Sequence, residues 1–327
     1  MRAVRTNRFD PLLCDFEFSL SGMFYAAGFP LRLLTNSRDV MEAAAESWSP
    51  FPRLFDTPPL EFRVLVEPAG EVAAEPRFRK QRHILSLVSD AHNFATGDCS
   101  TLSAVFHLSA ATAADHACLR WFYLEALAYM LLTQRYVLSL HAACIARDGE
   151  GILICGKSGA GKSTVSFAAA RAGFTYLADD CTWILLNSTE PIAIGKPHQV
   201  RFRQDAAQHF PEVAGYLASL RPNRKLSIEL PTSLFPALRT AGRCPVRRLV
   251  FPDRDSSGPP RAERMDPAEA AELLLADLPS YGPEVNAMHE QTIQSLTRLP
   301  AWRLHYRSLD DAIRLLHQWD RPPGLSI

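Results

Sequence analysis

A glycine-rich stretch near the middle of the chain constrains the fold more than any other feature. Residues 156–163 read Gly-Lys-Ser-Gly-Ala-Gly-Lys-Ser and satisfy the pattern G-x-x-x-x-G-K-[ST], the phosphate-binding loop, or P-loop, of many nucleotide-binding proteins. An apolar run from Gly151 to Cys155 precedes the loop, and a helical pattern from Thr164 to Ala170 follows it. The motif requires a strand before it and a helix after it, so a chance glycine-rich turn is the weaker interpretation.

The spacing within this loop indicates the ligand that it suits. Glycines let the backbone turn tightly, partly at positive φ, so that main-chain N–H groups converge on phosphate oxygens. The helix that follows adds its positive N-terminal end. Lys162 can reach the β- and γ-phosphates, and the Ser163 hydroxyl can bind Mg²⁺. We predict nucleotide contacts along the whole loop: Gly156, Lys157, Ser158, Gly159, Ala160, Gly161, Lys162, Ser163 and Thr164.

Two acidic residues end the next predicted strand. The apolar run 174–178 leads into Asp179 and Asp180. In an α/β sheet this edge faces the ligand crevice, so one carboxylate can hold Mg²⁺ and the other can accept a proton from an attacking hydroxyl. Without a P-loop ahead of it, the pair would be read as an ordinary polar strand end. His141 lies inside an apolar strand, where a structural histidine is the usual interpretation.

The remaining sequence predicts two domains. Residues 1–110 contain alternating segments and predict a smaller β-rich N-terminal domain of unknown role. Residues 111–327 alternate strands with helices and predict an α/β domain around the loop. Within it we expect one long buried helix from Ala113 to Arg135 and another from Phe210 to Leu220. The basic cluster from Arg77 to His83 is expected to protect a strand edge, with binding of an acidic partner as the alternative.

Composition excludes several classes of protein. Lys plus Arg and Asp plus Glu each number 35, so the zero net charge predicts no nucleic acid partner and no attraction to a membrane surface. We see no signal peptide at the N-terminus, and the most apolar helix is too short to span a bilayer. The seven cysteines are scattered without a C-x-x-C pair, which favours reduced thiols in a cytoplasmic protein over zinc sites or disulfides.

The segment from His141 to Asp180 resembles the C-terminal catalytic domain of HPr kinase/phosphorylase. In that family a strand histidine lies fifteen residues before the first glycine of the loop, the loop reads G-x-S-G-x-G-K-S, and an Ala-Asp-Asp motif follows about twenty-three residues after that glycine. This chain has His141, Gly156 and the run Ala178-Asp179-Asp180 at the same intervals. Three elements in register are far more specific than the loop alone.

The resemblance implies a P-loop serine kinase whose fold is the one that HPr kinase shares with phosphoenolpyruvate carboxykinase. By that analogy Asp179 is the general base, His141 assists or orients it, and Lys162 stabilises the transferring phosphoryl group. Ser163 and Asp180 would bind the metal. ATP and Mg²⁺ are then the cofactors, and a Ser or Thr hydroxyl of a peptide or small protein is the acceptor. Which aspartate is the base and which is the metal ligand stays open.

Two departures narrow this resemblance. Thr164 stands where HPr kinases usually carry Glu, and their Glu-Ile-Arg-Gly-Leu-Gly signature is missing downstream, which argues against HPr as substrate and against phosphorolysis. The chain is more similar to HPr-kinase-related proteins found beside small PqqD-like peptide-binding proteins, some of which phosphorylate precursors of ribosomally made peptides. A PqqD-like partner follows from that likeness. Four basic residues are candidates for phosphate or substrate contacts: Lys196, Arg201, Arg224 and Lys225. The equal alternative is that they are solvated charges on loops.

Two other functions stay open from the sequence. The first is a regulatory module that binds ATP but transfers nothing, which His141, Asp179 and Asp180 argue against because a sensor needs no base. The second is a kinase for a small alcohol, for which the sequence shows no pocket. The sequence also leaves homo-oligomer formation open.

Overall fold

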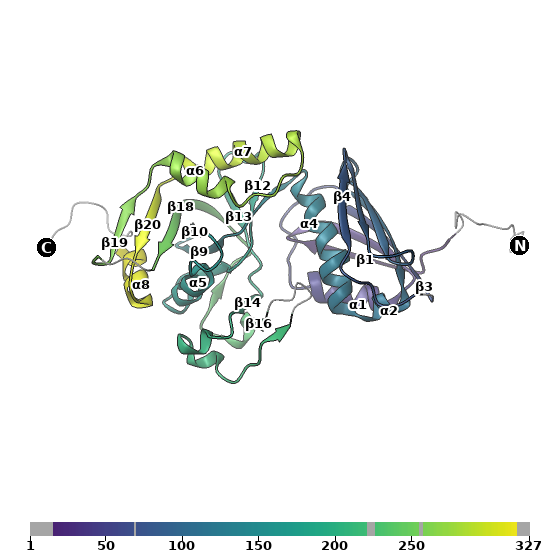
Figure 1. Cartoon of the computed structure of the whole chain (residues 1–327), viewed down its shortest axis with the longest axis horizontal. Helices are drawn as coiled ribbons and strands as arrows, with labels where there is room; N and C mark the ends of the chain where they lie inside the picture. The colour runs from purple at the N-terminus through teal and green to yellow at the C-terminus, as the bar shows by residue number, and fades with distance from the viewer. Residues whose placement is uncertain (1–15, 69, 221–225, 255–257, 319–327) are drawn as a thin grey trace, which may run out of the picture.

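The structure, a computed structural model, describes residues 16–68, 70–220, 226–254 and 258–318. The chain forms two regions, each built on a sheet, with the earlier residues on the right of Figure 1 and the later residues on the left. This mixed α/β architecture agrees with the predicted fold class. No helix in the described part of the chain combines the length and apolar character needed to cross a membrane.

The earlier region contains a seven-stranded sheet among the described residues. In spatial order its strands are β1 (Leu20–Ala26), β2 (Phe29–Thr35), β3 (Leu60–Glu67), β7 (Ser103–Ser109), β6 (Phe94–Asp98), β5 (Ile84–Val88) and β4 (Arg77–Gln81). Strand β4 forms one edge, and its Arg77, Arg79 and Lys80 side chains are exposed. This exposed charge fits both expectations for the segment, protection of the strand edge and binding of an acidic partner.

Helices pack against this sheet in one apolar core with strand residues such as Phe62 and Phe106. The predicted single helix from Ala113 to Arg135 is wrong, because Asp115 adopts φ −85° and ψ 84° and its side chain accepts the Cys118 N–H. The shorter helices that result pack in the same apolar core as the N-terminal sheet. The domain boundary between residues 110 and 111 stays a prediction. The helices of this region are α1 (Arg38–Trp48), α2 (Ala110–Ala114), α3 (His116–Cys118), the π-helix η1 (Leu119–Leu124) and α4 (Glu125–Thr133).

The later region contains a ten-stranded sheet among the described residues. Its main path runs β17 (Arg239–Thr240), β11 (Thr175–Ala178), β9 (Ala143–Arg147), β10 (Glu150–Ile154), β18 (Arg243–Asp253), β13 (Ile192–Ile194), β12 (Thr182–Leu185) and β8 (Val137–Leu140). Two more strands, β20 (Ala301–His305) and β19 (Arg261–Arg264), extend it from β18.

Strand direction brings the predicted site residues together. β10 pairs antiparallel with β9, and β9 pairs antiparallel with β11, so β10 and β11 point the same way. The C-terminal ends of strands that point the same way lie at one edge of the sheet. That edge carries the glycine-rich loop after β10 and the pair Asp179-Asp180 after β11.

Helices cover both faces of this sheet (Figure 1). Ile152 and Ile154 on β10 pack under one helix pair, α5 with α8, whereas Leu153 faces the other pair, α6 with α7. The alternation of these three residues therefore buries β10 on both sides. The helices are α5 (Lys162–Arg171), α6 (Pro267–Leu275), α7 (Pro283–Thr297) and α8 (Leu309–Gln318).

A small third sheet lies beside the loop edge and consists of β14 (Gln199–Phe202), β16 (Leu226–Pro231) and β15 (Ser219–Leu220). The helix predicted from Phe210 to Leu220 is wrong. Only a short 3₁₀ turn, Pro211–Val213, forms there, and Gly215 then takes a positive φ of 92°. A glycine in this conformation ends helical geometry, and the chain continues into β15 instead.

Candidate active site

The loop between β10 and α5 turns on its three glycines. Gly156, Gly159 and Gly161 have φ values of 138°, 93° and 89°, which other residues adopt only with strain. At Gly161 space is short as well, because a Cβ there would lie 3.1 Å from the Tyr306 hydroxyl. The predicted strand, tight turn and helix are all present. Phosphate binding by this turn stays a prediction.

Lys162, the first residue of α5, lies over this turn. Its side chain is buried, and its Nζ donates to the carbonyl oxygens of Gly156 at 2.5 Å and Lys157 at 3.1 Å. Burial lowers the pKa of Lys162, an effect that Asp180 and Asp277 oppose. The structure therefore holds the ammonium group of Lys162 against the loop, where a bound phosphate would replace the carbonyl contacts.

Asp179 is the buried acid of the site, with 6% of its surface exposed. Its Oδ2 accepts the main-chain N–H of Arg201 at 2.6 Å. Its carbonyl oxygen accepts the Ser163 hydroxyl at 3.0 Å, which joins the end of β11 to the start of α5. Burial raises the pKa of Asp179 to about 6, while Arg201 works in the opposite direction. A carboxyl group that ionises near neutral pH is suited to general-base catalysis.

His141 contacts the other acid. Its Nε2 lies 3.1 Å from Oδ1 of Asp180, and the second carboxylate oxygen of Asp180 lies 3.5 Å from Nη1 of Arg201. Sequence analysis expected His141 to assist or orient Asp179, whereas its imidazole contacts Asp180, and Asp179 accepts the main-chain N–H of Arg201 instead. The structure thus brings the His141 imidazole close to both acids, and the imidazole contacts Asp180.

The four basic candidates from the sequence have different positions. Arg201 on β14 joins both acids and also pairs with Glu229. Lys196 lies 3.5 Å from Glu125 on α4 and so links the two regions. Arg224 and Lys225 lie outside the described residues.

Sequence reasoning missed Arg203, an exposed residue just after β14. One of its guanidinium nitrogens lies 3.8 Å from the position that a Cβ on Gly159 would occupy. Arg203 also acts on Lys162 as a neighbouring positive charge. Its place two residues after Arg201 could have suggested a second cation at the loop.

The acids open into a pocket of about 390 Å³ that lies between the two regions. Its floor contains Asp179 and Asp180, and much of its wall is aromatic. Four of the aromatic rings come from the earlier region and one from the later region: Phe78, Trp121, Phe122, Tyr129 and Trp183. Sequence analysis missed this wall, because an apolar helical segment predicts a buried core rather than a binding surface.

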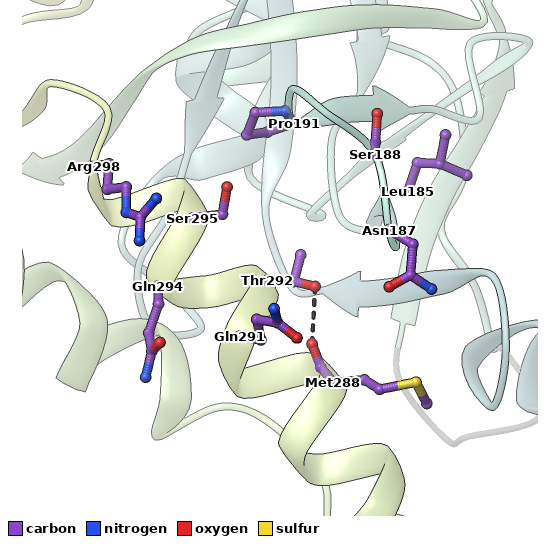
Figure 2. A pocket seen from close by; sticks show the side chains of 10 residues that line it. All are labelled: Leu185, Asn187, Ser188, Pro191, Met288, Gln291, Thr292, Gln294, Ser295 and Arg298. Atoms are coloured by element: carbon purple, nitrogen blue, oxygen red, sulfur yellow. Dashed lines mark hydrogen bonds between the residues drawn. The ribbon is translucent and has the colours of Figure 1, made fainter.

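A second pocket of about 280 Å³ lies between the turn after β12 and helix α7 (Figure 2). Its lining is mostly polar and includes Asn187, Gln291 and Arg298. The Thr292 hydroxyl donates within α7 to the carbonyl oxygen of Met288 at 2.9 Å. This pocket is at the end of β12 opposite to Asp180, and none of the predicted site residues lines it.

Comparison with known proteins gives little support for a family. No family model matches the chain, and no curated protein matches it. Among solved structures, the HPr(Ser) kinase/phosphatase from Coxiella burnetii is similar over 56% of this chain and 97% of its own, with 13% identity and a TM-score of 0.31. A likeness this weak carries no argument about function, so the proposal below depends on the geometry of the site.

Proposed function

We infer that the protein is an ATP- and Mg²⁺-dependent kinase that transfers the γ-phosphoryl group to a Ser or Thr hydroxyl of a peptide or small protein. One observation carries this proposal. Asp179, whose pKa is raised to about 6, lies against the first turn of α5 through Ser163 and also forms the floor of a pocket. A base between an anion-binding turn and a pocket is the arrangement that phosphoryl transfer needs.

The glycine-rich turn would form the donor side of the reaction. Its main-chain N–H groups and the N-terminal end of α5 supply positive charge for the phosphates. Lys162 is already held at this turn and would stabilise charge on the transferring group. Arg203 lies beside Gly159 and adds a second cation on the same side.

The residues present fit a magnesium ion. Ser163 donates its proton to the carbonyl oxygen of Asp179, which leaves its lone pairs for a cation. Asp180 adds a carboxylate that His141 and Arg201 orient. Oxygen atoms of this kind are the ligands that Mg²⁺ prefers, and the bound ion would neutralise charge on the β- and γ-phosphate oxygens.

Asp179 would start the transfer by accepting the proton of the acceptor hydroxyl. The hydroxyl oxygen then forms a bond to the γ-phosphorus while the bond from that phosphorus to the bridging oxygen breaks, and ADP leaves. The N–H of Arg201 fixes one carboxylate oxygen of Asp179. The same contact sets the orientation of the other carboxylate oxygen, which would accept the proton. Delivery of the peptide by a PqqD-like protein rests on the sequence resemblance alone.

The test is phosphoryl transfer by the purified full-length chain. Wild-type protein with labelled ATP and Mg²⁺ should phosphorylate Ser- or Thr-containing peptides, and Asp179→Asn should bind ATP but lose turnover. ATP binding without transfer to any acceptor would indicate a regulatory module. Label that enters only small metabolites of a cell extract would indicate an alcohol kinase.

A further inference from the structure

The pocket at the acids combines two chemically different kinds of group. Its lining includes the carboxylates of Asp179 and Asp180 and a set of aromatic rings. The ring centroids of Tyr129 and Trp183 are 4.8 Å apart, so the aromatic wall continues from α4 to β12. Its volume of about 390 Å³ is in the range of ligand pockets, roughly 300–1,000 Å³. A site of this size can accept one or two side chains near the base.

The aromatic wall depends on an irregular helix. Trp121 and Phe122 belong to the π-helix η1, in which the Glu125 N–H bonds to the carbonyl oxygen of Arg120 five residues earlier. This π-helix is followed by α4, so Trp121, Glu125 and Tyr129 recur four residues apart on the pocket side. π-Helical turns are rare, and they are frequent at functional sites.

The charged groups deep in the pocket are already matched with one another. Glu125 lies 3.5 Å from Lys196, and burial would raise the pKa of Glu125, but Lys196 and Arg120 hold it below its ordinary value. Asp180 is paired with His141 and Arg201. An entering ion would have to break one of these pairs, so an apolar group is the better occupant of the wall.

The pocket continues toward an open strand edge. Phe78 lines the pocket and belongs to β4, which ends the seven-stranded sheet among the described residues. Arg77 and Arg79 on β4 are exposed. An extended peptide can add to such an edge as a further strand, and two arginines favour acidic residues beyond the pocket. A small alcohol would not use this edge.

We propose that this pocket selects the acceptor: an extended peptide whose Ser or Thr reaches Asp179 while a neighbouring aromatic or large aliphatic side chain fills the wall formed by Trp121, Phe122 and Phe78. The rest of the peptide lies along β4. This inference rests on the proposed kinase function and assigns the earlier region of the chain to substrate recognition.

The first experiment is a positional peptide library with a fixed central Ser. Each flanking position is set in turn to every residue type, and incorporation of phosphate from labelled ATP is measured with the full-length protein. The expected result is strong selection for Phe, Trp, Tyr or Leu at one fixed position next to the Ser. A weaker preference for Asp or Glu farther along the peptide should follow from Arg77 and Arg79.

Substitutions in the pocket then show which residues produce the preference for an apolar side chain next to the Ser. Trp121→Ala and Phe78→Ala should each raise the peptide KM about tenfold or more, since each removes apolar surface that the peptide side chain would bury on binding. The KM for ATP should not change. Phe94→Ala is the matched control, because Phe94 is a half-buried aromatic residue of the same sheet that stacks on His107 outside the pocket.

A binding measurement separates this inference from the kinase proposal. Fluorescence anisotropy of a labelled peptide with Ala in place of the Ser should show binding that Trp121→Ala weakens and Phe94→Ala does not. Peptides phosphorylated without an apolar preference, or equally well by Trp121→Ala, would overturn the inference and leave the kinase standing. Binding that depends on Trp121, without transfer to any peptide, would support the pocket and refute the kinase.

Discussion

The two sides of Asp179 are built in different ways. On the donor side, one continuous segment supplies the glycine-rich loop, Lys162 and Ser163. The backbone conformation of this segment, with its glycines at positive φ, determines the shape of the loop. On the acceptor side, the pocket draws side chains from β4, η1, α4 and β12, which together span the chain from Phe78 to Trp183. The comparison teaches that a candidate phosphate-binding turn can be predicted from a local motif, whereas a candidate acceptor pocket exists only after folding.

The largest effect is expected on the donor side. Lys162→Ala should reduce kcat by at least about 10²–10³-fold, because it removes a positive group held at the phosphate position. Lys157→Ala is the control, since Lys157 is exposed and only its carbonyl oxygen contacts Lys162. Single-turnover transfer with saturating ATP measures both. Equal losses of kcat in Lys162→Ala and Lys157→Ala would contradict the distinction between the side-chain role of Lys162 and the backbone role of Lys157.

The next effect concerns Asp179 itself. Asp179→Asn should lower kcat about 10²–10⁴-fold by removing the base, with ATP affinity unchanged by calorimetry. It should also stabilise the fold at pH 7 by about 1–3 kcal/mol. The folded-state pKa of about 6 lies above the ordinary value of 3.8, so ionisation of Asp179 costs stability progressively as pH rises from about 4 to 6 and the cost stays above that pH.

Urea unfolding at pH 7 and at pH 3.5 checks this sign. The stabilisation should be present at pH 7 and absent at pH 3.5, where Asp179 is protonated in both the folded and the unfolded state. A variant that is fully active, or destabilised at pH 7, would refute the assignment of Asp179 as a buried base.

A third prediction uses the pH dependence of the rate. The plot of log kcat/KM against pH should rise and level off around an apparent pKa of about 6, as Asp179 of the free enzyme ionises. Arg201→Gln should move this limb to higher pH, because the Arg201 guanidinium lowers the pKa of Asp179. Arg203→Gln should leave the limb in place and raise the KM for ATP instead. A shift of the apparent pKa in Arg203→Gln would contradict the separate roles given to Arg201 and Arg203.

The smallest effect is expected at the link between the regions. Lys196→Met removes the 3.5 Å partner of Glu125, so it should cost on the order of 1–3 kcal/mol of stability and weaken peptide binding more than ATP binding. Lys157→Met, an exposed position, is the control. Thermal unfolding and peptide anisotropy report the two effects. Unchanged stability would show that Arg120 and Ser47 are sufficient to hold Glu125.

The sequence predicted the parts of the site that depend on short segments. The loop, the helix after it and the acids at the end of β11 lie where the spacing placed them, because each depends on neighbours within a few residues. The break at Asp115 is a local cap, since its side chain accepts the Cys118 N–H, and the reading of one continuous helix from Ala113 to Arg135 overlooked it. The π-helix that follows has no comparable local signal. Only the family resemblance placed His141 near the acids, and the prediction that it lies inside a strand is wrong, because β8 ends at Leu140 and β9 begins at Ala143. Its contact with Asp180 depends on the pairing of β8 with β12.

The π-helix η1 holds one residue more than an α-helical turn would need. Deleting a single codon within residues 119–124 would convert it to ordinary α-helix, in which the flanking turns keep their facing and only the side chains of the π-helical turn itself change position. The core under α4 and the distant nucleotide loop would keep their sequence. One small deletion there would therefore reshape the wall of the proposed acceptor pocket without touching the residues proposed to perform the chemistry.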